Sequence, residues 1–305
     1  MLPLLLCFCL ILVLPGEALA WGIGVHLRLG SQMLNSLHLL PKEVALLLAA
    51  YPYDYLYGCI SADITLGKKY THYLQHCHSW RMGGKIFEAA RGGPQKACAY
   101  GYLAHLAADS VAHGYMIPYK MLWSFNTRLL KHAYWEMRFE ALVEERHWRL
   151  ARELARRNFD EHDRLMSSLL AETLFSFSTN KKLFNSLLLL NRLKAWQEGL
   201  RRLGGISRWR LGEEHQSEYF ELGFRLATGI LSELDRSPYW RTDPTGEKAI
   251  EASKMIRKNM KTLWDEGKLS GREVQQILKE LKPRFREGLT QPERILELLS
   301  VEPPS

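Results

Sequence analysis

Residues 101–118, GYLAHLAADSVAHGYMIP, combine the apolar pattern of a buried helix with ionisable side chains at a spacing of four. His105, Asp109 and His113 recur among Ala, Leu and Val. A step of four residues advances about 400° around an α-helix, so the three side chains form one slowly winding stripe about 12 Å long. Burying such groups without partners costs free energy. The stretch therefore requires a fold in which other elements bring partners to this stripe.

Apolar residues at three-to-four spacing run through nearly the whole chain, and strand-like alternation is almost absent. The sequence therefore predicts an all-α fold, a multi-helix bundle. Helices are expected over residues 27–39, 41–51, 80–91, 95–115, 121–157, 164–175, 181–203 and 212–234. Residues 270–273 and 290–293 match the capping-box pattern that starts helices. An amphipathic basic stretch over 254–282 is expected either to pack on the bundle or to lie on an anionic membrane surface.

The first twenty residues, MLPLLLCFCLILVLPGEALA, have the pattern of a signal peptide. The apolar run from Leu2 to Leu14 is shorter than the ~20 residues a bilayer span needs, and Ala18-Leu19-Ala20 has the small-x-small pattern of a cleavage site. We expect cleavage after Ala20, a mature chain that starts at Trp21, and a secreted or periplasmic protein. The expected organisation is a signal peptide over 1–20, a main helical domain over 21–236, and a helical C-terminal extension over 237–305 that begins with a linker rich in Pro, Asp and Thr.

Charge and cysteine content give weaker indications. The chain carries a formal net charge of +8, which favours contact with anionic surfaces or phosphate-bearing substrates. Two of the five cysteines fall in the predicted signal peptide, which leaves Cys59, Cys77 and Cys98. These allow at most one disulfide, whose pairing stays open, and exclude a disulfide-built scaffold.

Histidines gather in the first half of the chain, where nine of the eleven lie. Metal sites need imidazoles and carboxylates that converge from several elements. One zinc ion, with ligand bonds of about 2 Å, cannot reach both ends of the stripe, but two or more ions could, with Asp109 between them. Metal ions a few ångströms apart suit phosphodiester hydrolysis. His132 and Glu136, again four residues apart, form a second candidate ligand pair.

An ordered set of motifs resembles the zinc-dependent phospholipase C superfamily, which includes the secreted bacterial phospholipases C and the amino-terminal region of glycosylphosphatidylinositol-specific phospholipase D. The set consists of Trp21-Gly22 with His26 shortly after, then GCISADI, HSW, HLAADSVAH and an HxxxE pair. The resemblance covers roughly residues 21–145. It implies a helical bundle around a trinuclear zinc site.

The resemblance also implies the ligands of three zinc ions. They are Trp21, through its α-amino nitrogen and carbonyl oxygen, with His26 and Asp109 for the first ion; Asp63, His78, His105 and the bridging Asp109 for the second; and His113, His132 and Glu136 for the third. We assign Asp63 a second role as the base that orients or deprotonates the attacking water. The HxW context favours His78 as a ligand, with His76 and His72 as alternatives.

The spacing from Asp109 to His113 leaves three residues, which resembles the phospholipase D branch rather than the five usual in bacterial phospholipases C. The helical pattern after residue 237 leaves no counterpart of the lipid-binding β-sandwich of some family toxins. The implied activity is hydrolysis of the glycerol-side phosphoester of phospholipids to diacylglycerol and a phosphorylated head group. The expected partner is a phospholipid or membrane surface, with no stable nucleic acid partner, and the oligomeric state stays open.

Three other functions compete with this one: a single-strand nuclease, phospholipase D-type or other phosphoester chemistry, and binding without turnover. Single-strand zinc nucleases share the three-zinc scaffold and begin with Trp-Gly and a His five residues after the Trp, but they usually close the second pair as HxxxD, so Glu136 favours the phospholipase. The third possibility is a zinc-dependent protein that binds membrane or metal without turnover. The aromatic run YPYDYLY over 51–57 either lines a head-group pocket or packs between helices.

Overall fold

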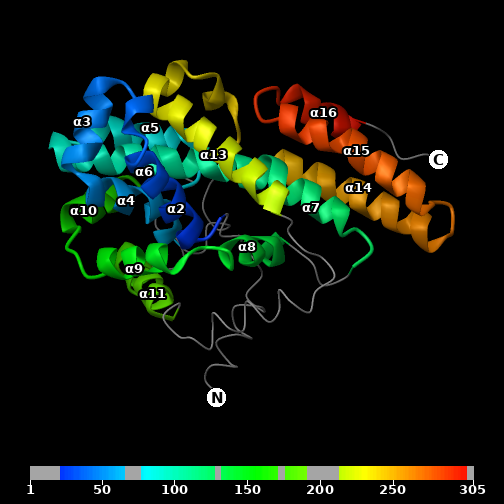
Figure 1. Ribbon diagram of the computed structural model, residues 1–305, viewed down its shortest axis with the longest axis horizontal. Coiled ribbons are helices and arrows are strands. Elements are labelled where there is room, and N and C mark those ends of the chain that lie inside the picture. The colour runs from blue at the N-terminus through cyan, green and yellow to red at the C-terminus, as the bar shows by residue number, and fades with distance from the viewer. Residues whose placement is uncertain (1–20, 66–76, 128–131, 171–175, 191–212, 301–305) are drawn as a thin grey trace.

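The computed structural model describes residues 21–65, 77–127, 132–170, 176–190 and 213–300. Within these ranges every regular element is a helix, which confirms the predicted all-α class (Figure 1). The α-helices are α2 (Ile23–Leu34), α3 (Lys42–Ala50), α4 (Pro52–Ser61), α5 (Trp80–Ala89), α6 (Gly92–Val111), α7 (Ile117–Trp123), α8 (His132–Glu140), α9 (Glu145–Leu154), α10 (Asp160–Leu169), α11 (Phe177–Leu190), α13 (Glu213–Glu233), α14 (Glu247–Asp265), α15 (Gly271–Glu287) and α16 (Glu293–Ser300).

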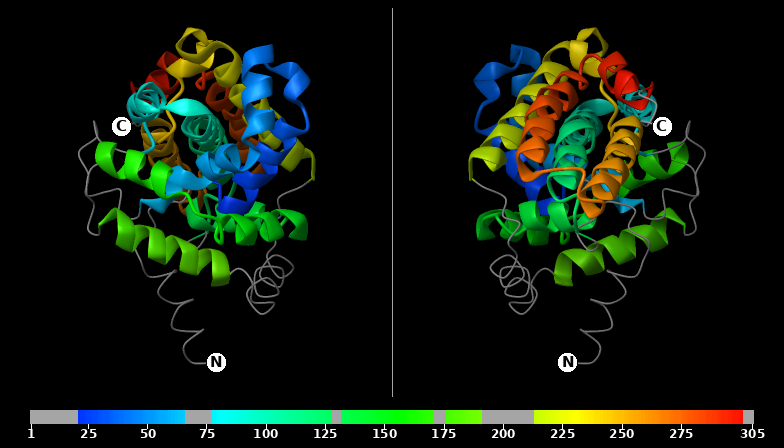
Figure 2. Two further views of the ribbon diagram at one scale, coloured as in Figure 1. Left: turned by 90° about the vertical axis from the view of Figure 1, so that its left-hand side faces the viewer. Right: turned by 90° about the vertical axis from the view of Figure 1, so that its right-hand side faces the viewer.

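A central rod organises the bundle. It consists of α6, the π-helix η5 (Ala112–Met116) and α7, which follow one another without a loop. The first part of the rod packs most extensively against α4 and α13, and α7 lies between α14 and α15 (Figures 1 and 2). The residues of α6 from Ala97 to Val111 are buried, so a polar side chain on this part of the helix faces protein.

Helices α4 and α6 meet backbone to backbone because each carries a glycine at the contact. A Cβ atom on Gly58 would lie 1.9 Å from the carbonyl oxygen of Cys98, and one on Gly101 would lie 2.0 Å from that of Tyr55. No larger side chain fits at either position. The close approach brings the last turn of α4 and the 3-10 helix η2 (Ala62–Ile64) against the polar stripe of α6.

The α-helix predicted over 95–115 ends at Val111, where the π-helix begins. Pro118 gives the physical reason. It has no N–H to donate to the carbonyl four residues earlier, and its ring would clash with that carbonyl in a regular α-helix. The wider π turn accommodates the proline, and such turns are frequent at functional sites. His113 lies in this turn.

Two further predictions of secondary structure were wrong. The single helix expected over 121–157 is divided into α7, α8 and α9; no Gly or Pro marks the turn between α8 and α9, so the apolar pattern alone concealed it. Helix α4 was not predicted, because its closely spaced aromatic residues hide the helical period. Tyr55 and Tyr57 of this helix are buried, so these two pack between helices.

The C-terminal region packs on the rod. In the segment predicted as a linker, Trp80 Nε1 donates a 2.8 Å hydrogen bond to the Thr242 carbonyl, and Thr242 Oγ1 donates a 2.8 Å bond to Ser110 Oγ. The predicted amphipathic stretch packs on the bundle as α14 and α15, and Ser270 and Glu273 form the predicted capping box. The domain boundary at 236/237 stays a prediction. The segment that follows it is hydrogen-bonded to α5 and α6 rather than exposed as a flexible linker.

Two further findings concern the cysteines and the length of the apolar helices. Cys59, Cys77 and Cys98 are buried free thiols, so the structure contains none of the disulfides that were left open. None of the helices in the described ranges has the length and apolar character needed to cross a membrane.

Candidate metal centre

Five buried side chains converge on the middle of α6 and form what we call the inner cluster. Its members are His26 of α2, Asp63 of η2, His78 in the turn before α5, and His105 and Asp109 of α6. The Asp109 carboxylate lies at its centre: Oδ1 is 3.1 Å from His26 Nε2, and Oδ2 is 3.0 Å from His78 Nε2 and 3.1 Å from His105 Nε2. The two oxygens therefore face different imidazoles, an arrangement in which Asp109 could contribute to two ion sites.

Asp63 completes the inner cluster. Asp63 Oδ1 lies 3.3 Å from His78 Nε2 and 4.0 Å from His105 Nε2. His105 is close to both sides of the cluster, because its ring also stacks on His26 with centroids 3.9 Å apart. Two candidate ligand groups result, His26/His105/Asp109 and Asp63/His78/His105.

A second group, the outer cluster, lies one turn further along the rod. It consists of His113 of η5 with His132 and Glu136 of α8. Glu136 Oε1 is 2.8 Å from His132 Nε2 and 3.9 Å from His113 Nε2. The side chain of His132 is 18% exposed, whereas Asp63 and Asp109 are fully buried. Of the two clusters, the outer one is the more open to solvent.

The distances between the side-chain atoms fit metal coordination. Ligand atoms about 2.0–2.1 Å from one tetrahedral zinc ion lie roughly 3.3 Å from each other. The separations within both clusters run from 2.8 to 4.0 Å around that value. Several of these atoms, namely His26 Nε2, both oxygens of Asp109, His113 Nε2 and His132 Nε2, are buried without a well-aligned hydrogen bond. Such groups cost about 1–3 kcal/mol each when unsatisfied, and cations bound in the two clusters would satisfy them.

Backbone carbonyls fix the tautomer of two imidazoles. His105 Nδ1 donates to the Cys59 carbonyl oxygen at 2.9 Å, and His113 Nδ1 donates to the Pro244 carbonyl oxygen at 2.8 Å. A carbonyl oxygen only accepts, so each Nδ1 carries the proton and each Nε2 presents a lone pair to its cluster. Partners of this kind orient the ligands of metal sites.

The electrostatic environment keeps these groups in the protonation states that metals require. Burial, followed by the proximity of His132, lowers the pKa of His113 to about 4. Burial, followed by Lys254, lowers the pKa of His132 to about 4 as well. Burial opposes ionisation of Asp109, but His105 and His26 outweigh it and hold its pKa well below the usual range. At neutral pH the outer imidazoles are neutral and Asp109 is ionised.

Trp21 lies directly before α2. Its side chain is fully buried, Nε1 donates to the sulfur of Met116 at 3.3 Å, and its ring lies 5.1 Å from that of Phe139. These contacts hold the residue against η5 and α8, the two elements that carry the outer cluster. His26 lies in the first turns of the helix that follows.

Several residues that support the clusters carry little or no signal in the sequence. Pro244 and Gly246 lie in the predicted linker, and Gly246 adopts a positive φ of 58° with its Cβ position 2.4 Å from the His113 carbonyl. Glu140, four residues after Glu136, accepts hydrogen bonds from the N–H groups of Gly24 and Val25 at 2.8 and 3.2 Å. Burial raises its pKa to about 7. Only the spacing of four from Glu136 hinted at Glu140; nothing local hinted at Pro244.

The structure thus brings together the eight interior side chains predicted as ligands. The alternatives His72 and His76 lie outside the described residues, so the choice of His78 rests on its own contacts. The assignment of each residue to a particular ion, the catalytic role of Asp63 and the coordination by Trp21 stay predictions.

A family model for zinc-dependent phospholipase C matches residues 25–181, which is just over half of the 305-residue chain. The matched region contains both clusters and ends before α13. No curated protein and no solved structure is detectably similar to the chain. With this match and with buried His, Asp and Glu clusters that suit zinc, the chain belongs to the zinc-dependent phospholipase C family.

Proposed function

We propose that the protein is a phospholipase C that binds three zinc ions and releases diacylglycerol and a phosphorylated head group from phospholipids at a membrane surface. The observation that carries the proposal is the presence of two adjacent ligand clusters along one buried helix, with Asp109 between two of the candidate groups. Bound zinc supplies Lewis-acid stabilisation of phosphodiester charge and activation of water. His26, Asp63, His78, His105 and Asp109 would hold two ions, and the outer cluster the third.

In this proposal Asp63 takes the proton from the attacking water. Helix η2 follows α4 directly, and the glycine contact between α4 and α6 fixes its position, so the carboxylate is held by backbone packing rather than by a loop. Substrate approaches from the side of the outer cluster, because His132 is the most exposed of the eight side chains while Asp63 is fully buried. The phosphate would then lie between the two clusters, and the lipid tails would stay outside.

The test is a parallel assay of the zinc-loaded protein that starts at Trp21, with phosphatidylcholine, phosphatidylinositol and single-stranded DNA as substrates. We expect diacylglycerol and a phosphorylated head group from at least one lipid. Asp63→Asn should lower kcat by about 10²–10⁴ and leave the fold intact. Asp54→Asn is a matched control, because Asp54 also contacts a histidine, His162 at 2.6 Å, but lies outside both clusters. Release of nucleotides without lipid cleavage would contradict the proposal and show that the protein is a single-strand nuclease.

We also propose that the chain is exported and processed after Ala20, and that the freed α-amino group of Trp21 binds zinc. The buried ring of Trp21 and the two Glu140 hydrogen bonds to the start of α2 support this, because together they fix the backbone at this point. The test compares zinc content of the processed protein with that of a variant that keeps one alanine before Trp21. We expect the variant to lose one zinc equivalent. Equal zinc content, or a different mature N-terminus by sequencing, contradicts the proposal.

A further inference from the structure

Helix α14 carries a lysine, Lys254, beside the outer cluster. The turn that precedes this helix contacts His113: the Pro244 carbonyl accepts from His113 Nδ1 at 2.8 Å, and Gly246 is the last residue before α14. From this turn α14 packs along η5 and α7 (Figures 1 and 2). The helix lies after the family-matched region, which ends at residue 181, so its contribution to the site belongs to this chain rather than to the family pattern.

Arg257 fixes how α14 is rotated on the rod. Its guanidinium donates to the carbonyls of Phe125 and Thr127, two residues that follow α7 on the way to α8. Lys254 is three residues before Arg257, so the two side chains are neighbours on the surface of α14. Lys254 therefore lies on the side of α14 that is turned toward the end of α7.

The electrostatics of His132 agree with this placement. Burial is the main cause of the low pKa of His132, and Lys254 is the next cause, ahead of Asp109. Because the interaction between two charges weakens with distance, the Lys254 ammonium must lie near this imidazole. Lys254 is exposed and forms no ion pair with a carboxylate among the described residues. It is therefore an unpaired cation next to His132, the most exposed of the eight candidate ligands.

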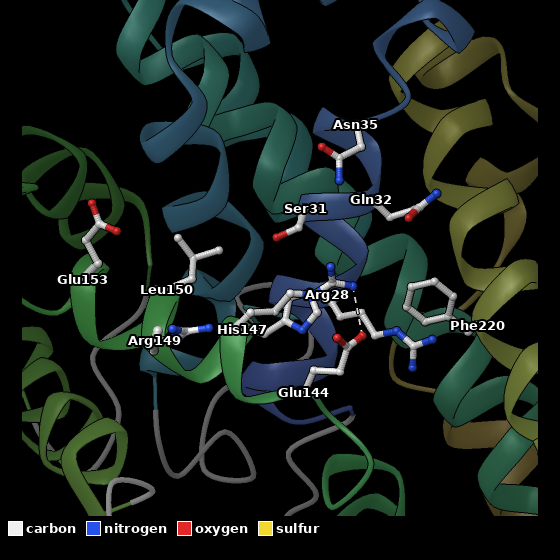
Figure 3. Close-up of a pocket in the computed structure, with 11 residues that line it drawn as sticks. Arg28, Ser31, Gln32, Asn35, Glu144, His147, Arg149, Leu150, Glu153 and Phe220 are labelled. Carbon is white, nitrogen blue, oxygen red and sulfur yellow. Dashed lines mark hydrogen bonds and ion pairs between the residues drawn. The ribbon is translucent and has the colours of Figure 1, made fainter.

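Two other exposed cations provide a comparison for Lys254. Arg149 lines a separate polar cleft between α2 and α9, and none of the residues that line this cleft belongs to either cluster (Figure 3). Lys258 lies on α14 itself, one turn beyond Lys254 and about 6 Å further from the start of the helix. Both are exposed and carry the same charge as Lys254. They serve as matched controls for the loss of one positive charge.

On the basis of the phospholipase activity proposed above, we propose that Lys254 binds the head group of the lipid and makes the protein favour hydroxylated head groups without a cation, such as inositol, over choline. Substrate approaches past His132, so the polar end of the lipid meets the Lys254 ammonium. This ammonium has three N–H donors on a flexible stem, which it donates to the head-group hydroxyls. A choline trimethylammonium offers no acceptor and carries the same charge as Lys254, so their contact is repulsive.

The test compares hydrolysis of phosphatidylinositol and phosphatidylcholine, each in micelles of a neutral detergent, by the zinc-loaded protein that starts at Trp21. We expect kcat/KM to be about tenfold or more higher for phosphatidylinositol. Lys254→Gln should bring the ratio of the two kcat/KM values close to one, whereas Lys254→Arg should keep most of the ratio because the charge remains. Lys258→Gln and Arg149→Gln remove the same charge elsewhere and should keep the wild-type ratio.

A second measurement does not depend on turnover. Calorimetric titration with inositol 1-phosphate and with phosphocholine should show about tenfold weaker binding of inositol 1-phosphate to Lys254→Gln than to the wild type, with unchanged zinc content. A wild-type ratio in Lys254→Gln, a wild-type preference for phosphatidylcholine, or loss of zinc in Lys254→Gln would overturn the role of Lys254 and leave the proposed function in place. Cleavage of neither lipid by the wild type would overturn both.

Discussion

The inner and outer clusters are built in different ways. The inner cluster is fully enclosed, and its geometry follows from the packing of whole helices: α4 and α6 touch at Gly58 and Gly101, which brings the Cys59 carbonyl to His105. The outer cluster is partly open. Its geometry depends on two backbone features, the π turn that carries His113 and the carbonyl of Pro244, a residue 131 positions away. Rigid packing thus fixes one part of the centre, and a turn outside the family-matched region fixes the other.

This comparison predicts the largest effect for a change at the glycine contact. In Gly101→Ala the new Cβ lies 2.0 Å from the Tyr55 carbonyl oxygen, so the backbones of α4 and α6 must separate. We expect a loss of more than about 3 kcal/mol in unfolding free energy and loss of zinc from both clusters. Thermal unfolding and zinc content measure the two effects.

The matched control for this change is Gly84→Ala on α5. The nearest atom to its new Cβ, on Trp240, is 3.9 Å away. Because alanine favours the helix over glycine by roughly 1 kcal/mol, this variant should be at least as stable as the wild type. If Gly101→Ala unfolds at the wild-type temperature and keeps its zinc, the inner cluster does not depend on helix packing.

A chelator should extract zinc from the two clusters at different rates. The outer cluster is reached by solvent at His132, whereas Asp63 and Asp109 are fully buried. We therefore expect a chromophoric chelator to extract the outer ion in a fast phase and the inner ions in a slow phase that requires local opening. The metal-free protein should be less stable by about 4 kcal/mol for each ion present at a thousand times its Kd. A single extraction phase for all ions would remove the distinction between the clusters.

A smaller, selective effect is expected at Gly246. Its φ of 58° is strained for any other residue, and a Cβ there would lie 2.4 Å from the His113 carbonyl. Gly246→Ala should lower zinc affinity at the outer cluster and leave the inner ions bound. The backbone strain alone costs about 1–3 kcal/mol.

Gly267→Ala is the control that distinguishes the effect of backbone strain from the effect of the contact with His113. Gly267 has a φ of 70°, but its Cβ position has no atom within 4 Å, so it carries the same strain without touching His113. Zinc titrations of both variants give the comparison. Equal zinc affinity in the two would show that the Gly246 turn does not position His113.

The sequence was sufficient to predict the helical class, and the spacing of four on apolar helices marked His105, Asp109, His113, His132 and Glu136. The other three converging side chains, His26, Asp63 and His78, were predicted only through the family resemblance. The sequence was not sufficient to predict the backbone features that hold these side chains in place. The π turn depends on how Pro118 is accommodated, and Pro244 acts through its carbonyl, which every residue has. Local sequence patterns identify side chains. The outer cluster, however, is held by backbone atoms that only the tertiary fold brings close to it.

The smallest effect expected is a difference in pH dependence between the metal-free proteins. The pKa of His132 is lowered to about 4, first by burial, whereas an unfolded histidine has a pKa of about 6.5. Between these values the unfolded chain binds more protons, so stability falls as the pH drops from 6.5 toward 4. From pH 7 to pH 5, His132 should account for about 2 kcal/mol of the loss. This loss should be absent in His132→Gln.

Thermal unfolding of metal-free wild type, His132→Gln and His38→Gln at the two pH values measures this difference. His38 is exposed on the short helix Leu37–Leu39, so His38→Gln should keep the wild-type slope. A shallower slope in His132→Gln alone means that the outer cluster is held neutral by burial even without its ion. That state suits rapid rebinding, because no proton has to leave before zinc binds. If His132→Gln instead keeps the wild-type slope, solvent reaches the outer cluster freely and its imidazoles titrate as exposed ones do.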